Sequence, residues 1–252
     1  MKDEDDVFRK FHDSFSRTNG HFHILEQRVP VEVQMSYFKF SENLRKENNP
    51  PRPLNDEQCL QNYAILKLET TSAEEKKALL STLATSKNVK AYRLLEQYVK
   101  EPDPEVASWG YMALMESRIS LESEFTDERQ VYISTGLGGK DDKLRFYALL
   151  LSTDNQPFKE YQTKMIEQEL PFAFKEAGWE LEKLHLADGY VEAVFLLPVK
   201  AEIKEVFDHL ITECNQYGNF LSPVYSITNI KEYSEEEIQK AIQQNGDSKS
   251  SH

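Results

Sequence analysis

The chain has 252 residues, of which 39% are hydrophobic and 29% are charged, with a formal net charge of −13 at pH 7. This length can bury the core of one large domain or two modest ones. Nucleic acids and anionic membranes are held by clustered Lys and Arg, so the acidic balance argues against either as a partner. The acidic N-terminus lacks a secretory signal, and no apolar run reaches the roughly 20 residues of a spanning helix. The sequence therefore predicts a cytoplasmic protein.

The two cysteines, Cys59 and Cys214, lie far apart, each inside a helical pattern. They form neither a disulfide framework nor a zinc-binding spacing, which favours small buried thiols in a reducing compartment. No local motif supplies Cys214 with the base that a nucleophile needs. The sequence predicts no cofactor and no metal.

Residues 1–50 form a predicted N-terminal arm with a short helix and a strand. Aromatic and apolar residues at helical spacing indicate the helix: Val7, Phe8, Phe11 and Phe15. Alternating apolar residues then predict the strand: Val29, Val31, Val33, Met35 and Tyr37. The arm either packs on the rest of the fold, which we favour, or is offered to a partner.

Three histidines in the arm raise a metal hypothesis, with Asp13 and Glu26 nearby: His12, His21 and His23. No second spaced pair of ligands completes a site, so a surface histidine cluster is the favoured interpretation. The proline-rich stretch from Lys46 to Pro53 cannot continue a helix or a central strand, and it predicts a stiff linker.

Residues 54–121 show the apolar periodicity of four helices. Ser72 and Glu75 form a capping box for the second helix, and Asp103 with Pro104 predicts the start of the fourth. An offset of about 31 residues superposes the first helix pair on the second. The aligned positions include Tyr63 with Leu94, Leu68 with Val99, and Leu83 with Leu114.

These helix pairs resemble a HEAT-like repeat. The resemblance rests on Leu94-Leu95, Val99, Asp103-Pro104-Glu105-Val106, Gly110 and Ala113-Leu114. The pattern departs from the family at Ala107, where an Arg often stands. The resemblance covers about a quarter of the chain and implies a stack of helix pairs, with protein binding as a family tendency.

Residues 131–244 predict an α+β domain, and residues 245–252 a disordered tail. A Val131 run, a glycine turn and Leu144–Leu151 indicate a hairpin, and a helix from Asn155 follows that we expect Pro171 to kink or divide. A hairpin turns at Asp188-Gly189, then come a strongly amphipathic helix from Ile203, a strand over 224–230 and a short terminal helix. The order strand, helix, strand, strand, helix, strand predicts a ferredoxin-like (βαββαβ) sandwich, with the Val131 run as an extra edge strand.

The glycine turn is the stretch most similar to a phosphate-binding loop. Its candidate ligand residues are Gly136, Gly138, Gly139 and Lys140. A phosphate loop leads into a helix and needs Ser or Thr after Gly-Lys, whereas Asp141 and a strand follow here. A structural hairpin turn is therefore favoured over a ligand site.

The segment 189–195 resembles the third-strand motif of RNA-recognition domains. Asp188 stands where that family has a basic residue and Glu192 where it has a stacking aromatic, so we do not expect RNA binding. Of the remaining polar candidates, His185 lies in another predicted element than Asp208 and His209, and no motif pairs them. We find no catalytic signature.

The sequence as a whole predicts an α+β protein in which HEAT-like helical pairs precede a ferredoxin-like sandwich. The function we expect is a non-catalytic adaptor or scaffold that binds another protein, with a homodimer through the sheet as a further prediction. Trp109 and Tyr111 lie off the apolar stripe of the fourth helix and are the candidate partner-binding residues, or else contact the N-terminal arm. The alternative is a small-ligand-sensing regulatory protein that uses the ferredoxin-like domain.

Overall fold

The structure is a computed structural model, and it describes residues 22–47, 53–125 and 131–247. Its contacts divide the chain into two compact units, with the break between Gly136 and Leu137. The first unit is built of helices and the second of a mostly antiparallel sheet with helices, so the predicted α+β class with N-terminal helices is confirmed. The domain ranges given above stay a prediction.

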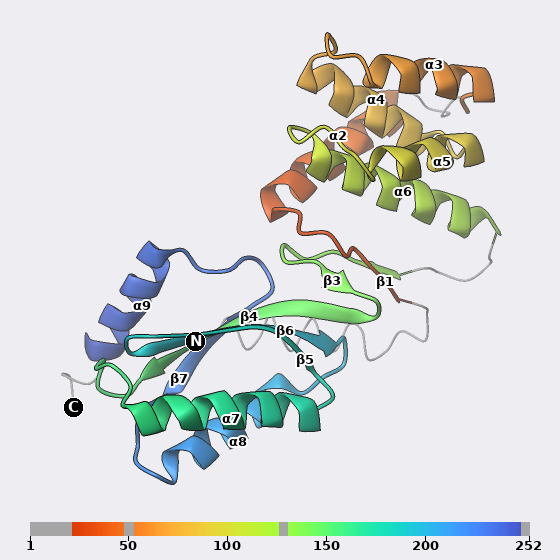
Figure 1. Cartoon of the computed structure of the whole chain (residues 1–252). Coiled ribbons are helices and arrows are strands. Elements are labelled where there is room, and N and C mark those ends of the chain that lie inside the picture. Colours follow the sequence, from red (N-terminus) through yellow and green to blue (C-terminus); the bar gives the residue numbers. More distant parts are fainter. Residues whose placement is uncertain (1–21, 48–52, 126–130, 248–252) are drawn as a thin grey trace. The chain divides into compact units, whose positions relative to one another are not determined.

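The helical unit contains a stack of helices that Figure 1 shows in orange to green. They are α2 (Val31–Glu47), α3 (Asp56–Leu66), α4 (Ala73–Thr85), α5 (Val89–Tyr98) and α6 (Ala107–Phe125). Asn55, Ser72 and Asn88 cap α3, α4 and α5 by accepting hydrogen bonds from first-turn N–H groups, which a side-chain oxygen at this position does best. The buried side chains that join these helices include Leu80, Leu83, Leu95 and Met112.

Glycine at position 110 lets α6 approach α5. A Cβ atom there would lie 3.0 Å from Cε1 of Tyr98, closer than packed side chains tolerate. The predicted start of this helix is displaced, because residues 104–106 form a turn and α6 begins at Ala107. Asp103 still caps that turn, since its Oδ1 accepts from the N–H of Glu105 at 3.0 Å.

The strand predicted over 29–37 is wrong, because residues 31–37 belong to α2 and Val29 precedes that helix. Val29, Val33 and Tyr37 are four residues apart, and this spacing satisfies a helix as well as a strand. Val29 and Tyr37 are fully buried, whereas Met35, which a strand would have placed on the same face, is 67% exposed. Within α2, a helical period explains why Tyr37 is buried and Met35 is exposed, which the alternation of a strand does not.

The Val131 run does not extend the large sheet, contrary to the prediction. It forms β2 (Val131–Ile133), which pairs in parallel with β1 (Phe22–Ile24) inside the helical unit. The extra edge strand of the large sheet is β3 (Gly139–Lys140), and it pairs with the start of β4. The hairpin thus turns at Asp141 and Asp142, after the glycines.

The second unit has the predicted ferredoxin-like order. Its elements after β3 are β4 (Lys143–Ser152), α7 (Glu160–Glu176), β5 (Glu180–Ala187), β6 (Tyr190–Pro198), α8 (Ile203–Asn215), β7 (Leu221–Thr228) and α9 (Glu235–Asp247). β4 and β6 lie at the centre, β5 flanks β6, and β7 flanks β4, all antiparallel. Helices α7 and α8 cover one face of the sheet, and α9 lies on the other (Figure 1).

An aromatic core fills the space between the sheet and its helix pair. Phe174 of α7, Phe195 of β6 and Phe207 of α8 are fully buried, and their ring centroids lie 4.7–5.8 Å apart. Trp179 stacks on Phe195 at 5.4 Å. Such ring pairs add to the burial of apolar area, and they fix how α7 and α8 sit on the strands.

Helix α7 continues through Pro171, so Pro171 does not divide it, which was one of the two predicted outcomes. A proline inside a helix costs about 3 kcal/mol. Three buried side chains of α7, Ile166, Leu170 and Phe174, face the sheet, and each contributes about 1.5–3 kcal/mol by burial. Packing therefore outweighs the loss of one backbone hydrogen bond.

Several predictions fall on residues outside those described: the helix over 7–15, the histidines His12 and His21, most of the proline-rich linker, and the last residues of the tail. In the described ranges, none of the helices has both the length and the apolar character needed to cross a membrane.

Candidate functional site

A polar cluster lies on the sheet face opposite α7 and α8. The register of the central strands places Glu192 of β6 beside Leu149 of β4 and beside His185 of β5, so all three share this face. Tyr147 and Tyr190 stand on the same face at the diagonal positions. The two-residue turn at Asp188-Gly189 fixes this register, and Gly189 adopts the φ of +82° that the turn requires.

Glu192 is the centre of the cluster. One carboxylate oxygen accepts a hydrogen bond from the Tyr147 hydroxyl at 3.0 Å, and the other lies 4.0 Å from Nε2 of His185. The Glu192 side chain is 12% exposed and that of His185 is 52% exposed. A shielded carboxylate, oriented by a phenol, therefore faces an imidazole that solvent reaches.

Tyrosine side chains pack beside Glu192 and His185. Tyr147 is fully buried beneath the ring of Tyr233, with centroids 5.2 Å apart. Burial, and then the hydrogen bond to Glu192, raise the pKa of the Tyr147 hydroxyl, which stays protonated and can only donate to the carboxylate. The Tyr190 ring lies edge-on to His185, and burial together with Glu235 and Glu192 raises the pKa of its hydroxyl.

This arrangement is suited to proton transfer. An imidazole can accept or donate a proton, and Glu192 is the carboxylate that faces this ring, at 4.0 Å. Among the residues that the structure describes, no group of three or more His, Cys, Asp or Glu side chains could hold a metal ion. The sequence prediction that no motif pairs His185 was incomplete, since the register of the Asp188-Gly189 hairpin places it opposite Glu192.

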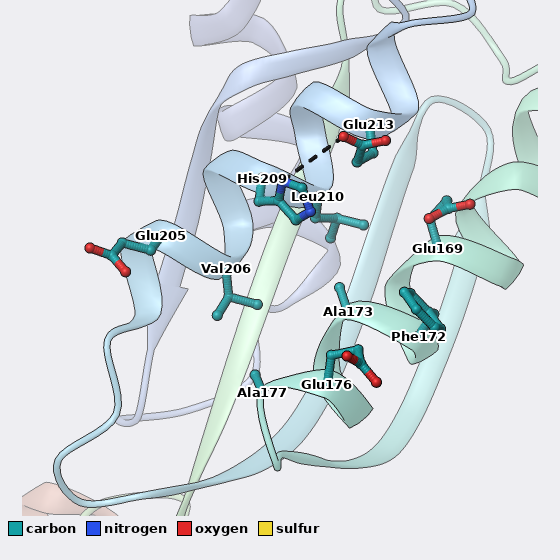
Figure 2. A pocket seen from close by; sticks show the side chains of 10 residues that line it. All are labelled: Glu169, Phe172, Ala173, Glu176, Ala177, Glu205, Val206, His209, Leu210 and Glu213. Atoms are coloured by element: carbon teal, nitrogen blue, oxygen red, sulfur yellow. Dashed lines mark ion pairs between the residues drawn. The ribbon is translucent and has the colours of Figure 1, made fainter.

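A second surface feature is a groove between α7 and α8, which encloses about 560 Å³. Figure 2 shows Glu205 and Glu213 of α8 along one side, and Glu169 and Glu176 of α7 along the other. His209 lies 4.0 Å from Glu213, yet this carboxylate is 40% exposed, against 12% for Glu192. The groove has an acidic rim and an apolar floor, without a shielded polar group.

The predicted partner-binding residues are not exposed anchors. Trp109 is 6% exposed, and its Nε1–H donates to Ser81 Oγ at 2.9 Å. Its ring packs edge-on against Tyr37 and Phe40 of α2, which is the predicted alternative of contact with the N-terminal segment. Tyr111 is half-buried. The exposure expected for Trp109 is wrong, because α2 covers it.

The glycine turn is a structural element in this fold. Gly136, Gly138 and Gly139 are buried, and Gly138 has a φ of +68°. The Lys140 ammonium lies 3.0 Å from the Glu180 carboxylate of β5. A role of these residues in ligand binding stays a prediction.

No family model matches the sequence, and no curated protein matches it. Two solved structures are similar in part. One is a proposed transposase from Deinococcus radiodurans R1, with TM-score 0.37 and 17% identity over 42% of this chain and 94% of that chain. The other is a REP-associated tyrosine transposase bound to a REP hairpin, with TM-score 0.31 and 11% identity over 46% of this chain and 68% of that chain.

These neighbours contradict part of the functional prediction. Both are transposases, which are enzymes, and one is bound to a REP DNA hairpin. The predictions of a non-catalytic adaptor, of protein binding as its role and of nucleic acid as an excluded partner are therefore wrong. The two TM-scores are too low for the likeness to give this chain a transposase activity, so the function has to be argued from the site itself.

Proposed function

We propose that the ferredoxin-like unit is an enzyme in which His185 transfers a proton to or from the substrate. The observation that supports it is the Glu192 carboxylate, which is shielded from solvent, oriented by Tyr147 and directed at a half-exposed imidazole. Enzymes that use a positioned imidazole in this way gain about 10²–10⁴-fold in rate from it.

The residues have separate roles in this proposal. His185 acts as general base on a hydroxyl nucleophile, either water or a substrate hydroxyl, and returns the proton to the leaving group. Glu192 faces the ring at 4.0 Å, and Tyr147 holds the carboxylate by its hydrogen bond. The ring of Tyr190 forms a wall against which a substrate lies. We further propose that the enzyme works in the cytoplasm, since both cysteines are buried free thiols.

The test is an activity screen with three probes: p-nitrophenyl acetate for acyl transfer, bis(p-nitrophenyl) phosphate for phosphoryl transfer, and a fluorescent single-stranded DNA hairpin. We expect turnover of one probe, and we expect His185→Gln to lower kcat by about 10²-fold or more. His209→Gln is the matched control, because His209 lies at the same 4.0 Å from a carboxylate, but an exposed one. Equal turnover by both variants, or no turnover of any probe, would reject the proposal.

A further inference from the structure

The groove between α7 and α8 has an apolar floor that is open to solvent. Val206 and Leu210 of α8 are directed toward α7, and Ala173 of α7 faces them (Figure 2). Phe172 stands beside this floor and is 60% exposed. A large apolar side chain that remains in water beside an apolar groove marks a surface suited to be covered.

The rim of the groove carries carboxylates without basic partners. Glu169 and Glu176 lie on the side of α7, and Glu205 and Glu213 on the side of α8. Among the residues that the structure describes, none of the four forms an ion pair with Lys or Arg, and Glu213 has only His209 at 4.0 Å. Like charges on two sides of one groove repel each other, so the rim favours an occupant with positive charge.

A stretch of this chain outside the described ranges has the charge that the rim favours. Residues 7–17 contain Arg9, Lys10 and Arg17 against a single acidic residue, Asp13, in a chain whose net charge is −13. This stretch precedes the helical unit, which begins at Gly20. It is therefore a basic segment in an acidic protein, and it is complementary to the rim of the groove.

The same stretch carries apolar side chains that match the floor. Phe8, Phe11 and Phe15 recur at the spacing of one helix face, and Arg9 and Lys10 then flank that face on its two sides. In a helix the aromatic stripe is about 10 Å long, and the part of α7 or of α8 that lines the groove spans about 12 Å. The stripe and the floor are thus matched in length.

We propose that residues 7–17 bind the groove between α7 and α8 of the same chain as an amphipathic helix, with the aromatic stripe on the floor and Arg9 and Lys10 at opposite rims. Recognition of a helix by a groove commonly uses anchors at this spacing. Because the segment is tethered to the unit it binds, its effective concentration is high and a weak contact suffices. The groove and the Glu192 cluster belong to opposite faces of the sheet, so the docked segment does not cover the cluster, and this proposal is independent of the proposed function.

Hydrogen exchange of the full chain, followed by mass spectrometry, tests the contact. We expect the amides of residues 8–17 to exchange more slowly than unstructured amides, because a docked helix protects its N–H groups. Phe172→Asp should raise their exchange rate about tenfold, since a charge replaces an apolar contact. Tyr217→Asp is the matched control, because Tyr217 is 67% exposed in the same unit and does not line the groove. Unprotected amides in the parent, or equal effects of the two variants, would overturn the proposal.

An exchange of charges tests whether the contact is direct. Glu176→Arg combined with Glu205→Arg should release the segment, because the rim then repels its basic residues. Adding Arg9→Glu and Lys10→Glu to this variant should restore slow exchange. A fourfold variant whose segment stays released would contradict a direct contact.

The last two measurements separate the groove from the rest of the surface and one chain from two. Glu167→Arg changes an exposed residue of α7 that does not line the groove, and it should leave the exchange of residues 8–17 unchanged. Release of the segment by this variant would show that net charge, rather than the groove, holds it. Protection that increases with protein concentration would place the segment in the groove of a second copy and would overturn the assignment to the same chain.

Discussion

The shielded carboxylates of the two units, Glu116 and Glu192, differ in their hydrogen-bond partners. In the helical unit, Glu116 is 6% exposed and accepts hydrogen bonds from Tyr37 at 2.5 Å, from Ser41 at 2.6 Å and from Arg45. In the ferredoxin-like unit, Glu192 has one donor from Tyr147 and a half-exposed histidine at 4.0 Å.

The difference separates structural polar groups from candidate functional ones. A buried carboxylate with three donors is well compensated, so it holds α2 on α6 and needs no ligand. A shielded carboxylate with unused capacity is costly unless something else binds there. We therefore place the function in the ferredoxin-like unit, and the following changes test the contrast.

The largest effect should come from Phe207→Ala, which breaks the aromatic core of the ferredoxin-like unit. We expect a loss of about 3–5 kcal/mol, because the side chain is fully buried and a cavity would remain. Urea unfolding followed through thiol alkylation measures the effect in each unit, since Cys214 lies in α8 and Cys59 in α3. Burial raises the pKa of Cys214 to about 12, so this thiol should react only on unfolding.

In the Phe207→Ala variant, Cys214 should become reactive at lower urea while Cys59 keeps the parental midpoint. A parallel shift of both thiols would show that the two units unfold as one. An unchanged midpoint for Cys214 would show that the aromatic core is not the main source of stability.

A smaller effect should come from Tyr37→Phe in the helical unit. The variant keeps the ring but removes one donor to the Glu116 carboxylate, which should cost about 1.5–3 kcal/mol. Chemical denaturation followed by helical circular dichroism measures it. Tyr111→Phe is the control, because Tyr111 belongs to the same unit and is only half-buried. Similar losses in the two variants would mean that Glu116 is not compensated in the way described.

The smallest effect should come from Asp103→Asn. Asp103 pairs with Lys76 of α4, and this hydrogen bond, followed by that from the Glu105 N–H, lowers the pKa of the carboxyl below its usual 3.8. A depressed pKa means that the stabilisation is present above pH 3.8 and is lost as the pH falls through the lower, folded value. The variant should therefore melt slightly earlier than the parent at pH 7, and the gap should close in acid. A gap that persists at pH 2 would assign the effect to something other than the charge.

The sequence predicts the ferredoxin-like topology because its signals are local. The stripe of α8, with Ile203, Phe207, Leu210 and Cys214 buried, and the turn at Asp188-Gly189 both lie within a few residues. The segment of α2 is predicted as a strand because residues four positions apart share a face in a strand as well as in a helix. The burial of Trp109 and the pairing of β2 with β1 depend on segments far away in the chain, and no local pattern carries that information.

The candidate sites were less accessible to prediction than the fold. His185 and Glu192 could have been paired from the hairpin register, but the contribution of Tyr147 requires the alignment of β4 with β6, which only the folded sheet provides.

The parallel pairing of β1 with β2 has a consequence for modularity. Residues 22–24 and 131–133 lie side by side, so the chain enters and leaves the helical unit at adjacent positions. A segment with adjacent ends can be inserted into a host protein, exchanged between proteins, or given new termini by circular permutation, with little disturbance at either junction.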